Sequence, residues 1–357
     1  MAAIYDRGTI NLTPLQPVNI LLIQLKRIGD LILTTPAIAA VREKFPQARI
    51  TLIISDECKA LAPAIRGVNR LWIMRRGFAG LGTLAAVAGG RFDYCVDFTR
   101  NDRSALLVFL SRAKKRIVSF RIKVRSKFRT RFYNEFVPHR MRDMHTADYH
   151  LALLAPLGIE NSPGAIQLEL PESAIASAEQ LLEAHNVRRP FIIFHPGSAR
   201  AEKFWDARRW SEVINHAAAD HDVDLVLTGG SSVFEQTHIS DIKSKVRRPV
   251  VDLSGKTDLL TLAALIGRAR LLITVDSAPM HLGAGTRTPQ VILFGPTNPF
   301  HWRPRESPAL ILQGDLASPM TDFVPKQPRI PMNQISTEPV IDAMETLLSS
   351  QAARPSL

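Results

Sequence analysis

The turn DSAPMH, which begins at Asp276, combines residue types suited to binding an anion. Asp276 and Ser277 are good helix-capping residues. Ala278 and Pro279 follow, and a proline with its fixed φ and no N–H suits a first helical turn. The free N–H groups and the positive dipole end of such a helix attract anions, and His281 adds a further donor. The turn therefore predicts a diphosphate site, the alternative being that Asp276 only caps the helix and that His281 is a packed surface histidine.

Asp30 is a candidate general base, because it lies in the turn KRIGD directly after the apolar segment VNILLIQL. A carboxylate fixed there can take the proton from a hydroxyl whose oxygen attacks, provided that the two groups lie within hydrogen-bonding reach. The alternative role of Asp30 is helix capping, for which Thr34 and Thr35 compete. The residue types leave both roles open.

A second turn, HPGSARAEKFW, offers another anion site. Gly197 and Ser198 are small enough for the backbone to approach phosphate oxygens closely. Lys203 would then supply a cation that stabilises the negative charge on a departing diphosphate. In the turn TGGSSVFE, Glu235 is placed like the acidic residues that bind ribose hydroxyls in nucleotide folds, a weak indication by itself.

Three other motifs do not predict sites. The GKT at 255–257 lacks the glycine that a P-loop needs five residues earlier, where the chain has Val250. The DVD at 222–224 leads straight into a strand and is more simply a strand entry than a metal clamp. The histidines at 139, 145 and 150 are six and five residues apart and do not share a helical face, so we expect no metal there.

Short apolar, β-branched segments alternate with amphipathic helical patterns along the chain, which predicts an α/β fold with parallel sheets. The turns described above follow such segments and would lie at the carboxyl edge, where open α/β sheets bind ligands. We expect two Rossmann-like domains facing each other across a cleft, residues 1–170 and 171–325, with residues 326–357 returning to the first domain as a segment and a helix. The predicted strands are 18–25, 50–54, 94–98, 191–194, 224–228, 271–275 and 291–294.

The 357 residues are 46% apolar, which suffices for two cores at roughly 150 residues per domain. The first 18 residues lack the apolar core of a signal peptide, and no apolar run approaches the ~18 residues that span a membrane. Cys58 and Cys95 are the only cysteines and have no partner nearby in sequence, which argues against disulfide, zinc and redox roles. We therefore expect a folded cytoplasmic protein.

Nearly all of the net charge of +12 lies in one segment, residues 112–142, which has twelve Lys or Arg and a single acid, Glu135. From Arg121 to Arg131 cations alternate strictly with other residues, so an extended segment would carry them on one face. Such a face attracts a polyanion: nucleic acid, an acidic membrane surface, or a phosphorylated lipid or glycan. The alternative is a solvated edge whose charges discourage aggregation.

Taken in order, the segments KRIGDLILTTPAI, HPGSARAEKFW, TGGSSVFE and TVDSAPMHLGAGTRTPQVILFGPTNP resemble glycosyltransferase family 9, the lipopolysaccharide heptosyltransferases. The resemblance covers most of the chain and is weakest between residues 74 and 142. It implies a GT-B fold of two Rossmann-like domains, in which the first holds the acceptor and the second holds the nucleotide sugar, typically ADP-heptose. It also implies an inverting transfer that needs no metal or other cofactor.

On this resemblance, Asp30 would be the catalytic base and Lys203 would bind the diphosphate and stabilise its departure. Glu235 would bind the ribose. The other donor-binding residues would be Gly197, Ser198, Asp276, Ser277, Ala278, Met280 and His281. Arg121, Lys123 and Arg125 of the basic segment would bind an acceptor that bears phosphate and Kdo carboxylates on a lipid anchor.

One departure from the family pattern concerns the donor sugar. The family commonly has Gly-Leu where this chain has Ala278 and Pro279, and the proline removes a backbone donor. A family 9 transferase with another sugar or acceptor is therefore one alternative. A non-catalytic protein that binds a polyanion or nucleic acid is another, and an NAD-dependent dehydrogenase is disfavoured because no G-x-G-x-x-G follows the first strand. We expect a monomer at the cytoplasmic face of the inner membrane, with no nucleic-acid partner.

Overall fold

Two six-stranded parallel sheets form the framework of the chain in a computed structural model, which describes residues 17–160 and 164–352. The first sheet has the order β3-β2-β1-β4-β5-β6 and the second has the order β12-β11-β10-β7-β8-β9. The strands of the first sheet are β1 (Asn19–Gln24), β2 (Arg49–Ser55), β3 (Arg70–Met74), β4 (Tyr94–Asp97), β5 (Lys115–Ser119) and β6 (Glu135–Val137). Those of the second are β7 (Phe191–His195), β8 (Asp224–Leu227), β9 (Val251–Asp252), β10 (Leu271–Val275), β11 (Gln290–Phe294) and β12 (Ala309–Gln313).

Each of the seven predicted strands is present, and the α/β class is confirmed. The central strands β1, β7, β10 and β11 are buried almost throughout because helices cover both faces of each sheet. The helices of the first domain are α1 (Ile28–Ile32), α2 (Thr35–Lys44), α3 (Leu81–Gly89), α4 (Asp102–Ser111), α5 (Arg121–Arg125), α6 (Lys127–Thr130) and α7 (Thr146–Ala152). Those of the second are α8 (Glu172–Ala184), α9 (Ala207–Asp220), α10 (Val233–Lys243), α11 (Leu259–Arg268), α12 (Ala278–Gly285), α13 (Pro299–Trp302) and α14 (Glu338–Ala352).

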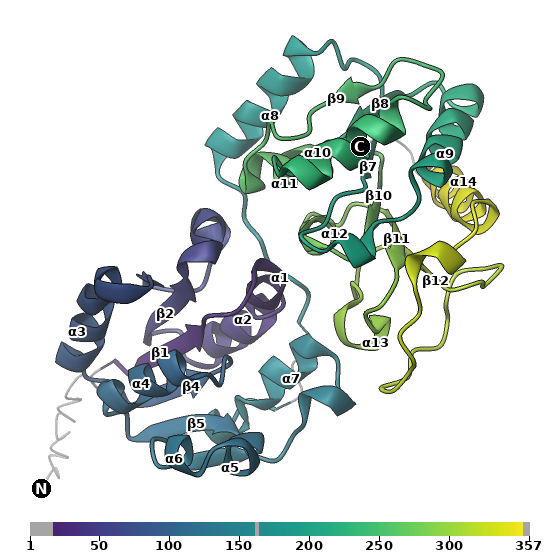
Figure 1. Cartoon of the computed structure of the whole chain (residues 1–357). Coiled ribbons are helices and arrows are strands. Elements are labelled where there is room, and N and C mark those ends of the chain that lie inside the picture. The colour runs from purple at the N-terminus through teal and green to yellow at the C-terminus, as the bar shows by residue number, and fades with distance from the viewer. Residues whose placement is uncertain (1–16, 161–163, 353–357) are drawn as a thin grey trace, which may run out of the picture.

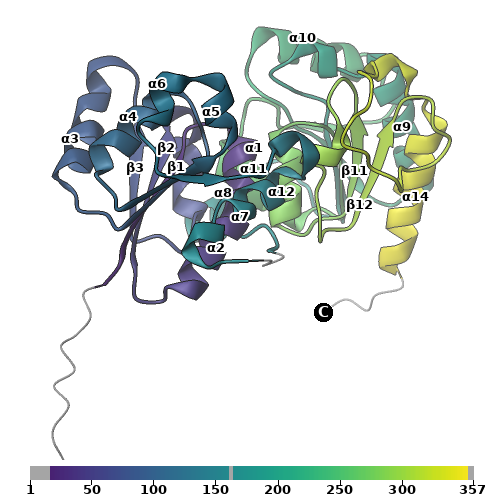
Figure 2. The ribbon, with the colours of Figure 1, turned by 90° about the horizontal axis from the view of Figure 1, so that it is seen from below.

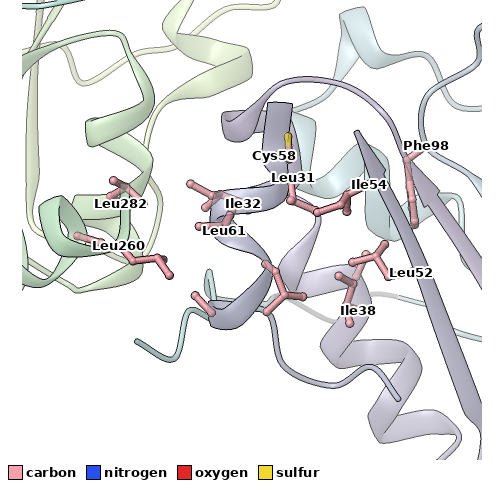
Figure 3. Close-up of a cluster of buried hydrophobic side chains, with 14 of the residues drawn as sticks. Leu31, Ile32, Ile38, Leu52, Ile54, Cys58, Leu61, Phe98, Leu260 and Leu282 are labelled. Atoms are coloured by element: carbon pink, nitrogen blue, oxygen red, sulfur yellow. The ribbon is translucent and has the colours of Figure 1, made fainter. Parts of the chain in front are cut away.

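The two domains meet where α1 of the first faces α12 of the second (Figure 1). Figure 3 shows Leu260 and Leu282 of the second domain pointing toward Ile32 and Leu61 of the first. All four side chains are buried in one apolar cluster, which is the kind of contact that fixes two domains relative to each other. The turns at the carboxyl edges of both sheets are thereby brought face to face.

The C-terminal helix α14 packs on the second sheet, so the prediction that it returns to the first domain is wrong. Val340, Met344 and Leu348 are buried in the same cluster as side chains of β10, β11 and β12. Their spacing of four residues gives α14 a single apolar face, and the second sheet offers the surface that covers it. Figure 1 shows α14 on the side of the second domain that lies away from the first.

The alternating stretch of the basic segment, residues 121–131, is helical and not extended. Ile122 is buried in the core beneath α5, and the side chain of Ser126 accepts a hydrogen bond from the Arg129 N–H and so caps α6. Two short helices separated by this cap take the place of the predicted extended segment. The alternating cations therefore do not all lie on one face. In a helix, residues four apart share a side, which groups Arg121 with Arg125 and separates them from Lys123.

Candidate active site

A cleft of about 720 Å³ lies between the two domains and collects most of the predicted site residues. Its walls come from the turns that follow β1, β7, β8 and β10, all at carboxyl edges. Nine of the predicted residues line it: Asp30, Gly197, Ser198, Lys203, Glu235, Asp276, Ser277, Ala278 and His281. The side chain of Met280 is instead buried among Ile292 and Phe294, so only its backbone N–H could serve a ligand.

Asp30 lies inside α1, whose N-cap residue is Arg27, so the capping alternative for Asp30 is wrong. Its carboxylate is largely buried, and its Oδ1 oxygen has no hydrogen-bond partner among the described residues. The Lys26 ammonium lies 3.4 Å from this oxygen without hydrogen-bonding to it. A buried carboxylate oxygen normally has a donor. On a cleft wall, such an oxygen can accept a hydrogen bond from the hydroxyl of a substrate.

His281 of the second domain rests directly on the backbone of the first, at Gly29. A Cβ added to Gly29 would lie 2.7 Å from His281 Cδ2, so only glycine permits this approach. Burial lowers the pKa of His281 to about 4, against the favourable charges of Asp276 and Asp30, and the ring is therefore neutral near pH 7. Its Nδ1 is buried without a partner among the residues described. His281 is thus a cleft residue and not a packed surface histidine.

Lys203 and Asp276 form an ion pair inside the cleft. Lys203 Nζ donates to Asp276 Oδ2 at 2.6 Å and to the Asp276 carbonyl at 2.8 Å, and both side chains are about nine-tenths buried. Thr297 Oγ1 donates to the same Oδ2. The N-cap of α12 is Ser277, so the alternative that Asp276 only caps the helix is wrong.

The start of α12 keeps polar groups free for a ligand. Ser277 makes no side-chain cap bond, and its buried Oγ has no partner in the described part of the chain. Pro279 lies in the first turn, as predicted, and lacks an N–H, so the Ser277, Ala278 and Met280 amides are the ones that an anion could use. The lysine beside them offsets the negative charge that Asp276 brings to the same place.

Glu235 lies between two glycines on the other wall. A Cβ on Gly197 or on Gly230 would displace its carboxylate from this position. The carboxylate accepts hydrogen bonds from Ser232 Oγ at 2.9 Å and from the Gly230 N–H at 3.4 Å. Glu235 therefore braces the start of α10 while facing the cleft, and its contact with a ribose stays a prediction.

Other residues of the cleft were not singled out from the sequence. His195 lies at its base, where Nδ1 is 2.9 Å from Thr228 Oγ1 and burial lowers the pKa to about 4. Thr297 and Trp302 come from the segment GPTNPFHW after β11, and Asp258 precedes α11. The segment GPTNP follows a parallel strand, as Asp276 does, and ligand-binding residues gather at this edge of a sheet. The same argument could therefore have predicted Thr297 as a site residue.

A second, smaller pocket of about 180 Å³ in the first domain is lined by four arginines. Its lining residues are Thr99, Arg100, Arg121, Ile122, Arg125 and Arg129. Arg129 pairs with Asp102 at 3.4 Å, but no carboxylate lines the pocket itself, so it keeps an excess of positive charge that favours an anionic ligand. Lys123 does not line this pocket, because its ammonium lies 3.9 Å from the ring centroid of Phe136.

A buried carboxylate builds the loop that carries Arg100. Asp97 is fully buried and accepts hydrogen bonds from the Thr99 and Arg100 N–H groups at 2.8 and 3.0 Å, and from Ser104 Oγ and Tyr133 OH at 2.7 Å each. These bonds hold Arg100 at a φ of 66°, which non-glycine residues seldom adopt. A residue kept in such a conformation by its surroundings is a frequent feature of ligand sites.

The arginine pocket lies at the same sheet edge as Asp30. Asp30 follows β1, Thr99 and Arg100 follow β4, and Arg121 follows β5, and these three strands are neighbours. Adjacent strands are about 4.8 Å apart, which places the pocket roughly 5–10 Å along the edge from Asp30. The Leu25 N–H, at the end of β1, also donates to Thr99 Oγ1 at 2.6 Å and ties the two turns together.

Among residues 17–160 and 164–352, no group of three or more His, Cys, Asp or Glu side chains is arranged to hold a metal ion. Within the same ranges, none of the helices is both long enough and apolar enough to cross a bilayer.

Comparisons with known proteins agree across most of the chain. The family model described as "Glycosyltransferase family 9 (heptosyltransferase)" matches residues 84–327. Lipopolysaccharide heptosyltransferase 3 of Escherichia coli strain K12 is 27% identical over 334 residues, which cover 91% of this chain and 96% of that protein. A family 9 glycosyl transferase from Veillonella parvula has a similar solved structure, with a TM-score of 0.81, 26% identity, and coverage of 93% and 97% of the two chains. E. coli ADP-heptose lps heptosyltransferase II shares the fold, with a TM-score of 0.75 at 20% identity over 94% of this chain and all of that one.

Proposed function

The chain belongs to glycosyltransferase family 9, and on that premise we propose that it transfers a heptose from ADP-heptose to the anionic inner core of lipopolysaccharide. It is a glycosyltransferase with the GT-B fold, so the alternative of a non-catalytic polyanion-binding protein is set aside. The names of its relatives support heptose as the sugar and lipopolysaccharide as the acceptor. The proposed place of action is the cytoplasmic face of the inner membrane, where the chain would work as a monomer.

One observation carries the proposed mechanism: an unpartnered oxygen of Asp30 and the buried Lys203–Asp276 pair share the walls of a single cleft. The acceptor oxygen attacks the anomeric carbon while its proton passes to Asp30. The bond between that carbon and the diphosphate oxygen breaks, and ADP leaves with the electron pair. One displacement from the side opposite the leaving group inverts the anomeric configuration.

Lys203 and the amides at the start of α12 stabilise the charge that develops on the departing diphosphate. Lys203 is held by Asp276 before the donor binds, so its ammonium is already in position when the bond breaks. We propose that these groups suffice without a metal ion. Glu235, between Gly197 and Gly230, would contact the ribose.

Binding of nucleotide sugars tests the donor assignment. At a hundredfold excess over Kd, a ligand adds about 2.7 kcal/mol to the free energy of unfolding. We expect ADP-heptose to raise the thermal midpoint by several degrees, and UDP- and GDP-sugars to leave it nearly unchanged. A large shift with a UDP-sugar alone would instead favour a family 9 transferase for another donor, as the Ala278–Pro279 departure allows.

The arginine pocket is the proposed site for a phosphate or carboxylate of the acceptor. The Arg121→Gln, Arg125→Gln double variant should raise the acceptor KM by about 10- to 100-fold, because each charge-assisted hydrogen bond contributes roughly 1.5 kcal/mol or more. The KM for ADP-heptose should stay within about twofold. Lys123→Gln is the matched control, since it removes one cation from the same helix but not from the pocket. An equal effect of the control would show that general positive charge, and not this pocket, holds the acceptor.

A further inference from the structure

Exposed apolar side chains are concentrated on one face of the first domain. The described residues include twelve large hydrophobic side chains that are exposed, and seven of them lie between residues 78 and 128. Most of these seven belong to α3, α4, α5 and α6, which lie along one side of the first sheet (Figure 2). The seven are Phe78, Leu81, Leu106, Phe109, Phe120, Val124 and Phe128.

Three phenylalanines on this face form an aromatic cluster of Phe109, Phe128 and Phe132. The ring centroid of Phe132 lies 5.3 Å from those of both Phe109 and Phe128, which joins α4 to α6. Phe132 packs against the core beneath, whereas Phe109 and Phe128 are 56% and 66% exposed. Leaving two aromatic side chains on the surface forgoes the free energy of burying them, so an exposed cluster of this kind marks an interaction site.

The surroundings of the aromatic cluster are strongly basic. No Asp or Glu occurs from residue 103 to residue 134, so α5, α6 and most of α4 carry no acid. Six exposed cations lie in this stretch, and Lys114 among them pairs with Asp93; the other five are Arg112, Lys123, Arg125, Lys127 and Arg131. Aromatic side chains flanked by Lys and Arg match the interface of an anionic bilayer, where rings sit at the headgroup level and cations pair with lipid phosphates.

We propose that the α4–α6 face docks on an anionic membrane surface, with the aromatic cluster inserted among the lipid headgroups. The inference rests on the proposed function, because an acceptor with a lipid anchor is located at a membrane. The arrangement of α5 and α6 supports the proposal. These helices place Arg121, Arg125 and Arg129 in the lining of the arginine pocket, while Val124 and Phe128 are exposed. Docking by this face places the pocket beside the lipid that carries the acceptor.

The packing of the rings favours a membrane over nucleic acid. Single-stranded nucleic acids bind to aromatic faces that are free to stack on bases. Here Phe128 and Phe132 meet edge to face, with their planes at 80°, and Phe132 packs against the core of the first domain. Insertion into a membrane requires only an exposed apolar surface and no free ring face, and Phe109 and Phe128 provide such a surface.

Co-sedimentation with lipid vesicles, without any sugar nucleotide, tests the proposal. The wild-type chain should bind vesicles in which about a quarter of the lipid is phosphatidylglycerol, and bind pure phosphatidylcholine much more weakly. The Phe109→Ser, Phe128→Ser double variant should lose about tenfold in partitioning. Leu316→Ser with Val324→Ser removes two exposed apolar residues from the second domain and should bind like wild type. Circular dichroism and the thermal midpoint establish that each variant is folded.

Transfer to a deacylated, water-soluble acceptor separates this proposal from the proposed function. The Phe109→Ser, Phe128→Ser variant should retain wild-type transfer to the soluble acceptor and lose activity only on the vesicle-borne one. The proposal is overturned if wild-type protein does not sediment with anionic vesicles, if the double variant binds them as well as wild type, or if the cluster variants weaken nucleic-acid binding and not vesicle binding. Each of these results leaves transfer to the soluble acceptor as an independent measure of function.

Discussion

Asp30→Asn should lower kcat by about 100- to 10,000-fold, the range that a positioned general base contributes. The variant keeps the shape of the side chain but cannot accept the acceptor proton. The wild-type Oδ1 has no hydrogen-bond partner but pairs with the Lys26 ammonium at 3.4 Å, so losing its charge should lower the free energy of unfolding by about 1 kcal/mol. KM for ADP-heptose should stay near the wild-type value, because the proposed donor-binding residues belong to the other domain. Steady-state kinetics and chemical denaturation measure both quantities.

Asp258→Asn is the matched control for this variant. Asp258 lines the same cleft, but its carboxylate accepts a hydrogen bond from the Thr261 N–H at 2.7 Å and caps α11, a role that asparagine also fills. Its kcat should remain within about threefold of wild type. Full activity in Asp30→Asn, or an equal loss in both variants, would contradict the assignment of Asp30 as the base.

Substitutions at the Lys203–Asp276 pair should affect the free energy of unfolding and kcat differently. Lys203→Met leaves the Asp276 carboxylate buried without its cation, which should cost about 3 kcal/mol in the free energy of unfolding. Asp276→Asn added to Lys203→Met removes that uncompensated charge and should restore most of the stability. Activity should not follow, because the double variant still lacks the ammonium that we propose stabilises the leaving diphosphate, and kcat should stay about 100-fold or more below wild type.

A structural role alone predicts a different outcome for the same three proteins. If Lys203 only holds Asp276 in place, the double variant should regain activity together with stability. Denaturation curves and kcat for each single variant and the double variant form a complete cycle, and the coupling in stability should be large while the coupling in kcat is small.

The sequence was sufficient to predict seven of the twelve strands, the central ones among them, and the edge at which the site lies. Continuous apolar runs such as LLITV belong only to strands buried on both faces, and the turns after parallel strands gather at one edge. That argument placed Asp30, Lys203 and Asp276 around one cleft, which the structure bears out. The contact of His281 with Gly29 depends on how the two domains are set against each other, and no local pattern records it.

The basic segment shows why other features were missed. Alternation over eleven residues is compatible with a strand, but the cap at Ser126 and the buried Ile122 favour two short helices. Arg100 joins the arginine pocket because the buried carboxylate of Asp97 holds its loop in an unusual conformation. Such a network involves side chains from several elements, and spacing along one segment cannot reveal it. The role of Asp276 was also open from the sequence, because an aspartate at this position can either cap the helix or form an ion pair.

Mass spectrometry of the transfer product, with NMR of the new anomeric centre, tests the central claim most directly. Purified chain is incubated with ADP-heptose and with a heptose-deficient core glycolipid, in parallel with UDP- and GDP-sugars, and Asp30→Asn serves as the inactive control. We predict a product larger by one heptosyl residue, formed from ADP-heptose alone and with the anomeric configuration inverted relative to the donor. Transfer from a UDP- or GDP-sugar but not from ADP-heptose, or a product that retains the donor configuration, would contradict the account.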